Sequence, residues 1–240
     1  MKRLPLILFA FSFLQNKVLA SSDEKFPIYD KQHNTVIGYY SRFQDDTLGH
    51  LKTTYYDHEG KEAVKEFLNT EKQGFVTYEI NQQQLSAAVK VNINPDVVLF
   101  ERTDTTNNKK KTATEARKEN SIAPLQLAKF IQSNIEKLKE GGKIPIYIAS
   151  WERLELVKMT LKKSDQFPFP SYLADKDIIV IEMRPANFII AQLVNPFYFR
   201  FNLKEQKITH MLGRIPLKKR NGGKWEDQEG VVWFVKKEAP

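Results

Sequence analysis

Short apolar runs, separated by turn residues at intervals of roughly ten residues, dominate the sequence from residue 26 onward. Asp30–Asn34 interrupts the first apolar stretch, and Asp57–Gly60 interrupts a later one. Gly60 can adopt the positive φ of a tight turn, and both interruptions predict β-hairpins. Residues 61–68 also fit one face of a helix, but we favour a strand there.

Three more strands are expected in "GFVTYEI", "LSAAVKVNI" and "DVVLFER", and this succession is typical of an antiparallel meander. Residues 102–121 follow without a large apolar side chain. They predict either a long hairpin tip or a mobile loop. The lysine run inside this segment is explained more simply as a solvated edge than as a contact for an acidic partner.

One amphipathic helix is expected at residues 124–139. Asn120 or Ser121 can cap it, Pro124 suits the first turn, and Gly141-Gly142 ends it. Its apolar stripe consists of Leu127, Phe130, Ile131, Ile135 and Leu138. A single helix among many strands predicts a mainly β (α+β) fold. We expect a curved antiparallel sheet, or a partly open β-barrel, packed on this one main helix.

Strand patterns resume after the helix, in "KIPIYIAS", "RLELVKMTLKK", "IIVIEMRP", "PFYFRFN", "KITHMLGRI" and "GVVWFV". Residues 187–195 lie between two prolines and are apolar almost all round, which predicts either two helical turns or a buried strand. No internal repeat or linker divides the chain. We therefore expect a single β-rich domain over residues 21–240.

The first 20 residues have the build of a secretory signal peptide. Lys2 and Arg3 precede an apolar run over residues 4–14, and "VLA" places a cleavage site after Ala20. The run is shorter than the roughly 20 residues that a membrane-spanning helix needs. The sequence contains no cysteine, which excludes a lipoprotein anchor and disulfides and favours a bacterial envelope protein. We expect export by the Sec route to the periplasm.

The chain is basic, with a formal charge of +8, and losing Lys2, Arg3 and Lys17 would leave +5. Export would put nucleic acids out of reach, so we expect no nucleic-acid partner. The acidic partners that remain are lipid headgroups, lipopolysaccharide phosphates and acidic glycans. Lysines that only keep the protein soluble are the simpler explanation of the same charge. The oligomeric state cannot be inferred from these patterns.

No motif for catalysis or cofactor binding stands out. The four histidines have no metal-ligand spacing, so we expect no metal, no cofactor and no catalytic residue. Glu152 and Glu155 lie beside Trp151, and paired carboxylates can hydrolyse glycosides, although two residues three apart on a strand face opposite sides. His210 is the remaining polar candidate. These three residues define an alternative function, an envelope glycan or lipid hydrolase.

The strand "PFYFRFN" carries three phenylalanines on one face, Phe197, Phe199 and Phe201. The simpler interpretation is that they pack on helix 124–139 as ordinary core. The alternative is an apolar wall that stays partly open as a ligand cavity, completed by Phe130 and Trp151. On that interpretation the protein is a non-catalytic binding or carrier protein for an apolar or amphipathic molecule. A ligand-free envelope scaffold is the third alternative.

The segment "RIPLKKRNGGKW" combines basic residues with a Gly222-Gly223 turn. We expect Lys218, Lys219, Arg220 and Trp225 to form an exposed surface that binds anionic membrane or lipopolysaccharide weakly. A solvated hairpin tip with Trp225 in the core is the simpler alternative.

The order of these elements resembles a group of known proteins. "YYDHEGKEAVKE", the central helix and "MRPANFIIAQLVNPFYFRFNLKEQKITHMLG" look like uncharacterised exported proteins of Gram-negative bacteria, grouped as domains of unknown function. The resemblance spans most of residues 27–235. It implies a periplasmic curved antiparallel sheet, similar in outline to the lipoprotein carriers LolA and LolB, and an apolar ligand. It implies no catalytic residues.

Overall fold

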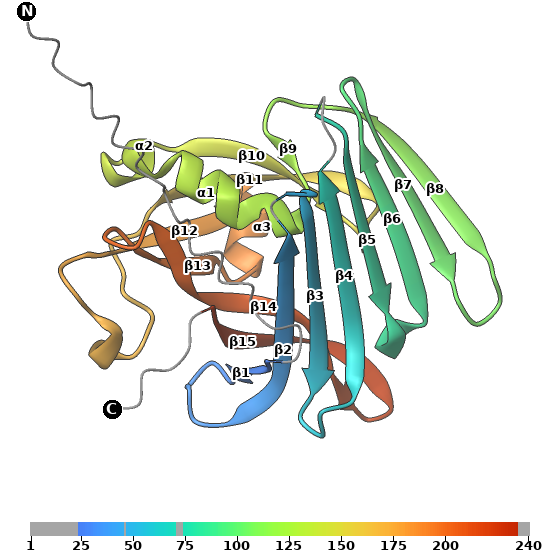
Figure 1. Cartoon of the computed structure of the whole chain (residues 1–240), viewed down its shortest axis with the longest axis horizontal. Coiled ribbons are helices and arrows are strands. Elements are labelled where there is room, and N and C mark those ends of the chain that lie inside the picture. Colours follow the sequence, from blue (N-terminus) through green and yellow to red (C-terminus); the bar gives the residue numbers. More distant parts are fainter. Residues whose placement is uncertain (1–23, 46, 71–73, 235–240) are drawn as a thin grey trace, which may run out of the picture.

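The computed structural model describes residues 24–45, 47–70 and 74–234. The predicted signal peptide and its cleavage site after Ala20 lie outside these residues. The described chain forms one continuous sheet of 15 strands, curved around a shared interior (Figure 1). The predicted class, a mainly β fold with a curved antiparallel sheet, is confirmed. One pair, β9 with β10, is parallel.

The sheet consists of two meanders that meet where β1 pairs with β15. We call β1–β8 the N-terminal half and β9–β15, with their helices, the C-terminal half. The strands of the N-terminal half are β1 Phe26–Tyr29, β2 Val36–Asp45, β3 His50–Asp57, β4 Glu62–Thr70, β5 Val76–Gln82, β6 Ala87–Ile93, β7 Val97–Asp104 and β8 Lys110–Ala116. Both predicted hairpins are present, and residues 62–70 form a strand as favoured.

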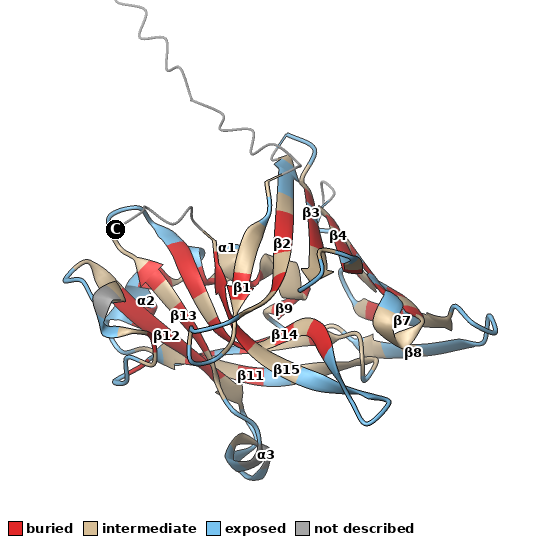
Figure 2. Ribbon diagram, turned by 90° about the horizontal axis from the view of Figure 1, so that it is seen from below, coloured by how far each residue is buried: buried red, intermediate tan, exposed pale blue. Residues whose placement is uncertain are grey.

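The polar segment 102–121 is a hairpin and a strand rather than a mobile loop. β7 and β8 pair in register as far as Thr103 with Lys110. Asp104 closes the turn, because its backbone N–H donates to Lys109 and its side chain accepts from the N–H of Thr106. β8 is mostly exposed (Figure 2), which agrees with its lack of large apolar residues.

The strands of the C-terminal half are β9 Ser121–Ile122, β10 Ile144–Ser150, β11 Glu155–Lys163, β12 Ile178–Pro185, β13 Phe197–Asn202, β14 Lys207–Asn221 and β15 Lys224–Trp233. The helices are α1 Leu127–Ser133, α2 Ile135–Lys139 and α3 Phe188–Leu193. Short 3-10 turns lie at Gln83–Leu85, Pro124–Gln126 and Ser171–Leu173.

The predicted helix at 124–139 is divided at Asn134. The Asn134 side-chain amide donates to the carbonyl of Phe130 at 2.9 Å, and its backbone N–H bonds to Ile131 instead. In a continuous α-helix the backbone N–H of Asn134 would bond to the Phe130 carbonyl. The Asn134 side chain takes this carbonyl instead, so the helical hydrogen bonds are interrupted there. Ile131, Ile135 and Leu138 of the predicted apolar stripe are nevertheless buried against the sheet.

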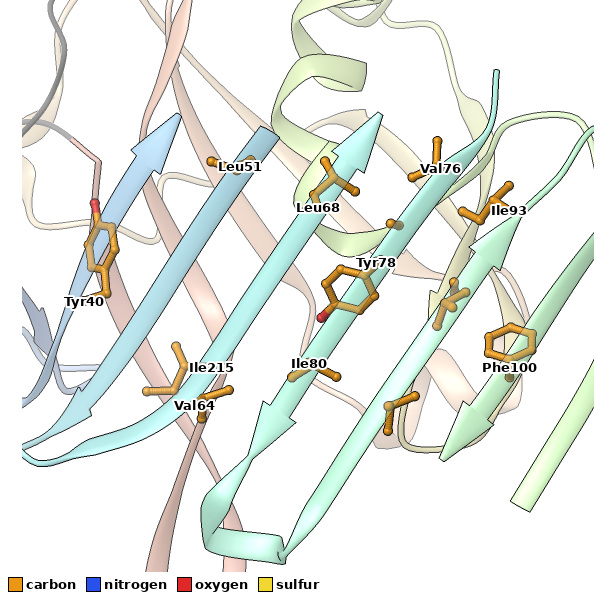
Figure 3. Packing of buried hydrophobic residues seen from close by; sticks show 14 of the residues in the cluster. Tyr40, Leu51, Val64, Leu68, Val76, Tyr78, Ile80, Ile93, Phe100 and Ile215 are labelled. Carbon is orange, nitrogen blue, oxygen red and sulfur yellow. The ribbon is translucent and has the colours of Figure 1, made fainter. Parts of the chain in front are cut away.

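A register shift and two glutamine side chains hold the N-terminal half against β14. A register shift in the β14–β15 pair between Ile215 and Lys218 leaves backbone groups of β14 available. Gln82 donates to the Pro216 carbonyl at 2.7 Å, while Gln84 donates to the Lys218 carbonyl and accepts from its N–H. Ile215 then packs among the inner-face residues of the N-terminal half (Figure 3), and Leu217 belongs to the same cluster. The two halves therefore enclose one interior.

The outer face of the C-terminal half is covered as well. Phe169, from the segment between β11 and β12, is buried against Tyr198, Leu212 and Trp233. Strands β12–β15 are therefore packed on both faces. On the outer face of the N-terminal half, Phe43 is exposed.

Residues 188–193 form helix α3, which settles the choice between helix and strand, but this helix is not buried. Phe188 is 74% and Ile189 69% exposed. The Asn187 side chain caps it by accepting the N–H of Ile189 at 2.9 Å. α3 projects away from the sheet at the bottom of Figure 2.

Candidate functional site

A cavity of about 810 Å³ lies between the two halves of the sheet. The C-terminal half lines it with residues of β10–β14 and the start of α1, and the N-terminal half lines it with residues of β2, β3 and β4. This volume lies within the range of roughly 300–1,000 Å³ that is usual for small-molecule sites. Its size and its position between the two halves make the cavity a candidate site.

The apolar wall of the cavity includes some of the predicted aromatic residues. Phe197, Phe199 and Trp151 line it, together with aliphatic and methionine side chains such as Met183 and Met211. Phe201 is fully buried among the residues packed on α1 and α2 and does not reach the cavity. Phe130 packs on the same core and is also absent from the lining. The strand "PFYFRFN" thus contributes both to core and to cavity.

The wall from the N-terminal half is polar, which the sequence analysis did not anticipate. Arg42, Thr53 and Glu66 lie opposite one another on β2, β3 and β4, and all three line the cavity. Tyr40 and Tyr55 form the neighbouring row. Directly opposed residues on paired strands have Cβ atoms about 5 Å apart, so these side chains form one polar surface.

Glu66 is the most deeply buried acid of this surface. Its carboxyl accepts a hydrogen bond from the Tyr78 hydroxyl at 2.5 Å. Burial raises the pKa of Glu66 above its usual value, although the bonds from Tyr78 and Tyr55 and the charge of Arg42 oppose that rise. Burial likewise raises the pKa of Tyr55 and Tyr78. Desolvation therefore favours the neutral form of each group.

Lys218 is the main correction to the predicted membrane surface. It is only 7% exposed, and its ammonium lies 2.6 Å from both Glu152 and Asp227. Arg214 bonds to the same two carboxylates. A lysine that enters the interior beside Trp151 must be paired to offset its desolvation, and this cluster supplies the pairs. Lys218 is therefore part of the cavity wall and not of an exposed surface.

The other residues of that predicted surface lie in the hairpin between β14 and β15. Lys219 and Arg220 are exposed, and Trp225 is 41% exposed. The Arg220 guanidinium carbon lies 5.9 Å from the centre of the Trp225 ring. The alternative in which Trp225 is tucked into the core is therefore wrong, and the hairpin tip presents basic and aromatic side chains, with Glu226 lying 3.9 Å from Lys219.

The three candidate hydrolase residues are not assembled into one site. Glu152 lines the cavity but is held by Arg214 and Lys218, and Glu155 lines it but pairs with Arg153 at 3.1 Å. His210 lies away from the cavity, between Phe169 and Trp233 on the outer face. Burial and the nearby charge of Arg200 lower the pKa of His210 to about 3.

α3 lies at the border of the cavity. Pro185, Ala186, Asn187 and Val194, which flank the exposed residues of α3 on both sides, contribute to the lining. An exposed apolar helix therefore stands beside the cavity.

The described residues contain neither a cluster of metal ligands nor a membrane-spanning helix. No three or more histidine, aspartate or glutamate side chains gather where they could hold a metal ion. None of the helices in residues 24–45, 47–70 and 74–234 is long and apolar enough to cross a membrane.

Comparisons with known proteins give little beyond this geometry. No protein-family model matches the chain, and no curated protein matches it. Among solved structures, the chain is similar to a β-barrel-like protein of the domain of unknown function DUF1849 from Brucella abortus. That match has a TM-score of 0.43 and 9% sequence identity, and covers 88% of this chain and 96% of the other. A similarity of this size says nothing about what the chain binds.

Proposed function

We propose that this protein is a periplasmic binding or carrier protein for an apolar or amphipathic molecule of the bacterial envelope. The observation that carries the proposal is the cavity of about 810 Å³ between the two halves, with its wall of phenylalanine, methionine and aliphatic side chains. A cavity with one large apolar wall and a few polar groups suits a ligand of mixed character. Export, and with it the periplasmic location, belongs to the proposal.

Binding explains the geometry better than hydrolysis. A glycoside hydrolase needs one carboxyl group that is free to donate a proton and a second carboxylate facing the same bond. Glu152 is already bonded to two cations, and His210 lies on the other face of the sheet. The scaffold alternative offers no reason for a cavity of this size.

Native mass spectrometry of the full chain, purified from a bacterial host, tests the proposal. We expect an adduct with the mass of a lipid or another amphiphile. Met211→Trp should weaken or remove the adduct, because the larger side chain takes up part of the cavity. Leu48→Trp places the same side chain on an exposed turn and should keep it. A wild-type protein that carries no adduct, and that binds no added amphiphile, contradicts the proposal.

A weak contact with anionic membrane is the second part of the proposal. Lys219, Arg220 and Trp225 make the hairpin tip basic and aromatic, and α3 exposes Phe188 and Ile189. Both elements extend toward the bottom of the view in Figure 2. Basic side chains near an anionic surface contribute about 1 kcal/mol each, and apolar side chains of a surface helix enter the boundary of the acyl chains.

Vesicle co-sedimentation at low salt separates these two contributions. Lys219→Gln with Arg220→Gln should weaken binding to anionic vesicles and leave binding to zwitterionic vesicles unchanged. Phe188→Ser with Ile189→Ser should weaken binding to both. Leu48→Ser, which removes an exposed apolar side chain from the N-terminal half, is the matched control and should change neither. Equal binding by all variants, or none by the wild type, leaves both surfaces without a membrane role.

A further inference from the structure

The cavity wall contributed by the N-terminal half contains a hydroxyl group without a partner. Thr53 is only 3% exposed, and among the described residues its Oγ1 has no hydrogen-bond partner. It lines the cavity between Arg42 and Glu66. A buried hydroxyl that forms no hydrogen bond costs free energy, so such groups in native proteins call for an explanation. A ligand atom that accepts a hydrogen bond from Thr53 is one such explanation.

Arg42 on β2 lies directly opposite Thr53 and carries a positive charge. It lines the cavity, and within the described residues no carboxylate lies within 4.0 Å of its guanidinium. Its side-chain hydrogen bond goes to the neutral amide of Gln44 at 3.5 Å, which is long. The basic residues on the opposite wall, Arg214 and Lys218, are instead paired with Glu152 and Asp227.

Glu66, on the far side of Thr53, is engaged with aromatic hydroxyls rather than with Arg42. Its carboxyl oxygen Oε1 accepts from Tyr78, and the Tyr55 hydroxyl bonds to the same carboxyl group. Burial raises the pKa of this carboxyl, so desolvation works against a fixed negative charge beside Arg42. The donors on this side of the cavity, the guanidinium of Arg42 and the hydroxyl of Thr53, are those that recognise an anionic oxygen.

Resting on the proposed function, we propose that Arg42 and Thr53 form the head-group site of the cavity, and that the ligand is an amphiphile with an anionic head. The head accepts hydrogen bonds from the Arg42 guanidinium and from Thr53 Oγ1. The apolar body lies against Phe197, Phe199 and Met211 on the opposite wall. A carboxylate and a phosphate head share this chemistry.

Binding of three probes with the same acyl chain tests the site: oleate, oleoyl lysophosphatidate and the uncharged oleyl alcohol. The full chain is first freed of co-purified lipid, and affinities are measured by calorimetry. We expect both acids to bind the wild type more tightly than the alcohol. Whichever acid binds more tightly identifies the head group that the site prefers.

Two variants locate the site, and a third is the control. Arg42→Gln should weaken acid binding roughly ten- to hundred-fold, the range expected for one lost hydrogen bond to a charged group, and change alcohol binding less than about threefold. Thr53→Val keeps the shape, should weaken acid binding, and should not destabilise the ligand-free protein, because the hydroxyl it removes has no partner. Lys52→Gln removes a charge from the exposed outer face of the same strand and should change nothing.

The outcomes separate the two proposals. If the wild type binds none of the three probes, the carrier function itself is contradicted. If it binds acids and alcohol equally, or if Arg42→Gln weakens all three alike, the carrier function stands and the head-group site is overturned. A loss of acid binding in Lys52→Gln as large as that in Arg42→Gln also overturns the site, because it would show a general effect of charge.

Discussion

The two halves of the sheet differ in how their faces are covered. The C-terminal half is covered on both faces, by α1 and α2 on the inside and by the segment around Phe169 on the outside. The N-terminal half packs its inner face, and part of its outer face, including Lys52, Lys65 and Glu79, is exposed. The cavity lies where they meet, and takes its apolar wall from the doubly covered half. The N-terminal half contributes Arg42, Thr53 and Glu66, and the C-terminal half adds the charged cluster of Glu152, Arg214 and Lys218.

The halves also differ in the titratable groups that they bury. Among the buried groups whose pKa is shifted are an acid of the N-terminal half, Glu66, and a base of the C-terminal half, His210. Desolvation favours the neutral form in both, but neutral means protonated for a carboxyl and deprotonated for an imidazole. The contributions of these two groups to the stability of the protein should therefore depend on pH in opposite directions.

The largest effect is expected from removing a ring that is packed between the layers. Phe201→Ala should lower the free energy of unfolding by about 3–5 kcal/mol, since Phe201 is fully buried beside α1 and α2. Phe43→Ala, on the open outer face of β2, should cost less than about 1 kcal/mol. Urea unfolding of both variants measures the difference, and equal losses would mean that the outer face of the N-terminal half is covered in solution.

His210 should make the protein less stable in acid. Its folded pKa is about 3 and its usual value 6.5, so the unfolded chain binds the proton more readily between these values. The free energy of unfolding should be unaffected by this group above pH 6.5. Below that pH it should fall by at most about 1.4 kcal/mol per pH unit. Unfolding of His210→Phe should depend less steeply on pH. His58→Gln, at an exposed histidine, should follow the wild type; a steep slope retained in His210→Phe contradicts the assignment.

Glu66 should act in the opposite direction. Because its folded pKa is raised, the folded state holds the proton more tightly than the unfolded chain, and stability falls as the pH rises above the usual value of 4.5. Glu66→Gln keeps an oxygen acceptor for Tyr78 and removes the titration. The stability of this variant relative to the wild type should rise between pH 4 and pH 7. Urea unfolding at a series of pH values measures it, and a constant difference would exclude Glu66 as the cause.

The sequence predicted most of the sheet because its strands alternate and its turns carry the expected residues. The β7–β8 hairpin shows the limit of this approach. β8 has no apolar pattern, and it forms through its backbone pairing with β7. The division of the helix at Asn134 and the exposure of α3 depend on local side-chain bonds and on the absence of packing, and hydrophobic periodicity reports neither.

The candidate site was predicted only in part, because strand alternation gives the face of a residue but not its partners. Phe197, Phe199 and Phe201 share a face, yet only the first two reach the cavity. Lys218 was assigned to the surface by its neighbours in sequence, whereas the register shift in β14 directs it to Glu152, which is 66 residues away. Glu66 did carry a signal, since a glutamate between Val64 and Leu68 interrupts the buried positions of an otherwise apolar strand face.

The smallest effect is expected at α3, and it tests whether the contrast in packing extends to this helix. Phe188→Ser with Ile189→Ser should change the free energy of unfolding by less than about 0.5 kcal/mol, because both side chains are already exposed and the cap from Asn187 is retained. Leu48→Ser, on the turn between β2 and β3, should behave the same way. Urea unfolding without lipid makes the comparison. A loss of 2 kcal/mol or more at α3 alone, roughly what removing a buried apolar side chain costs, would mean that the helix packs on the sheet in solution. Its apolar side chains would then be unavailable to a membrane until the helix opened, and the proposed contact would need that opening as a first step.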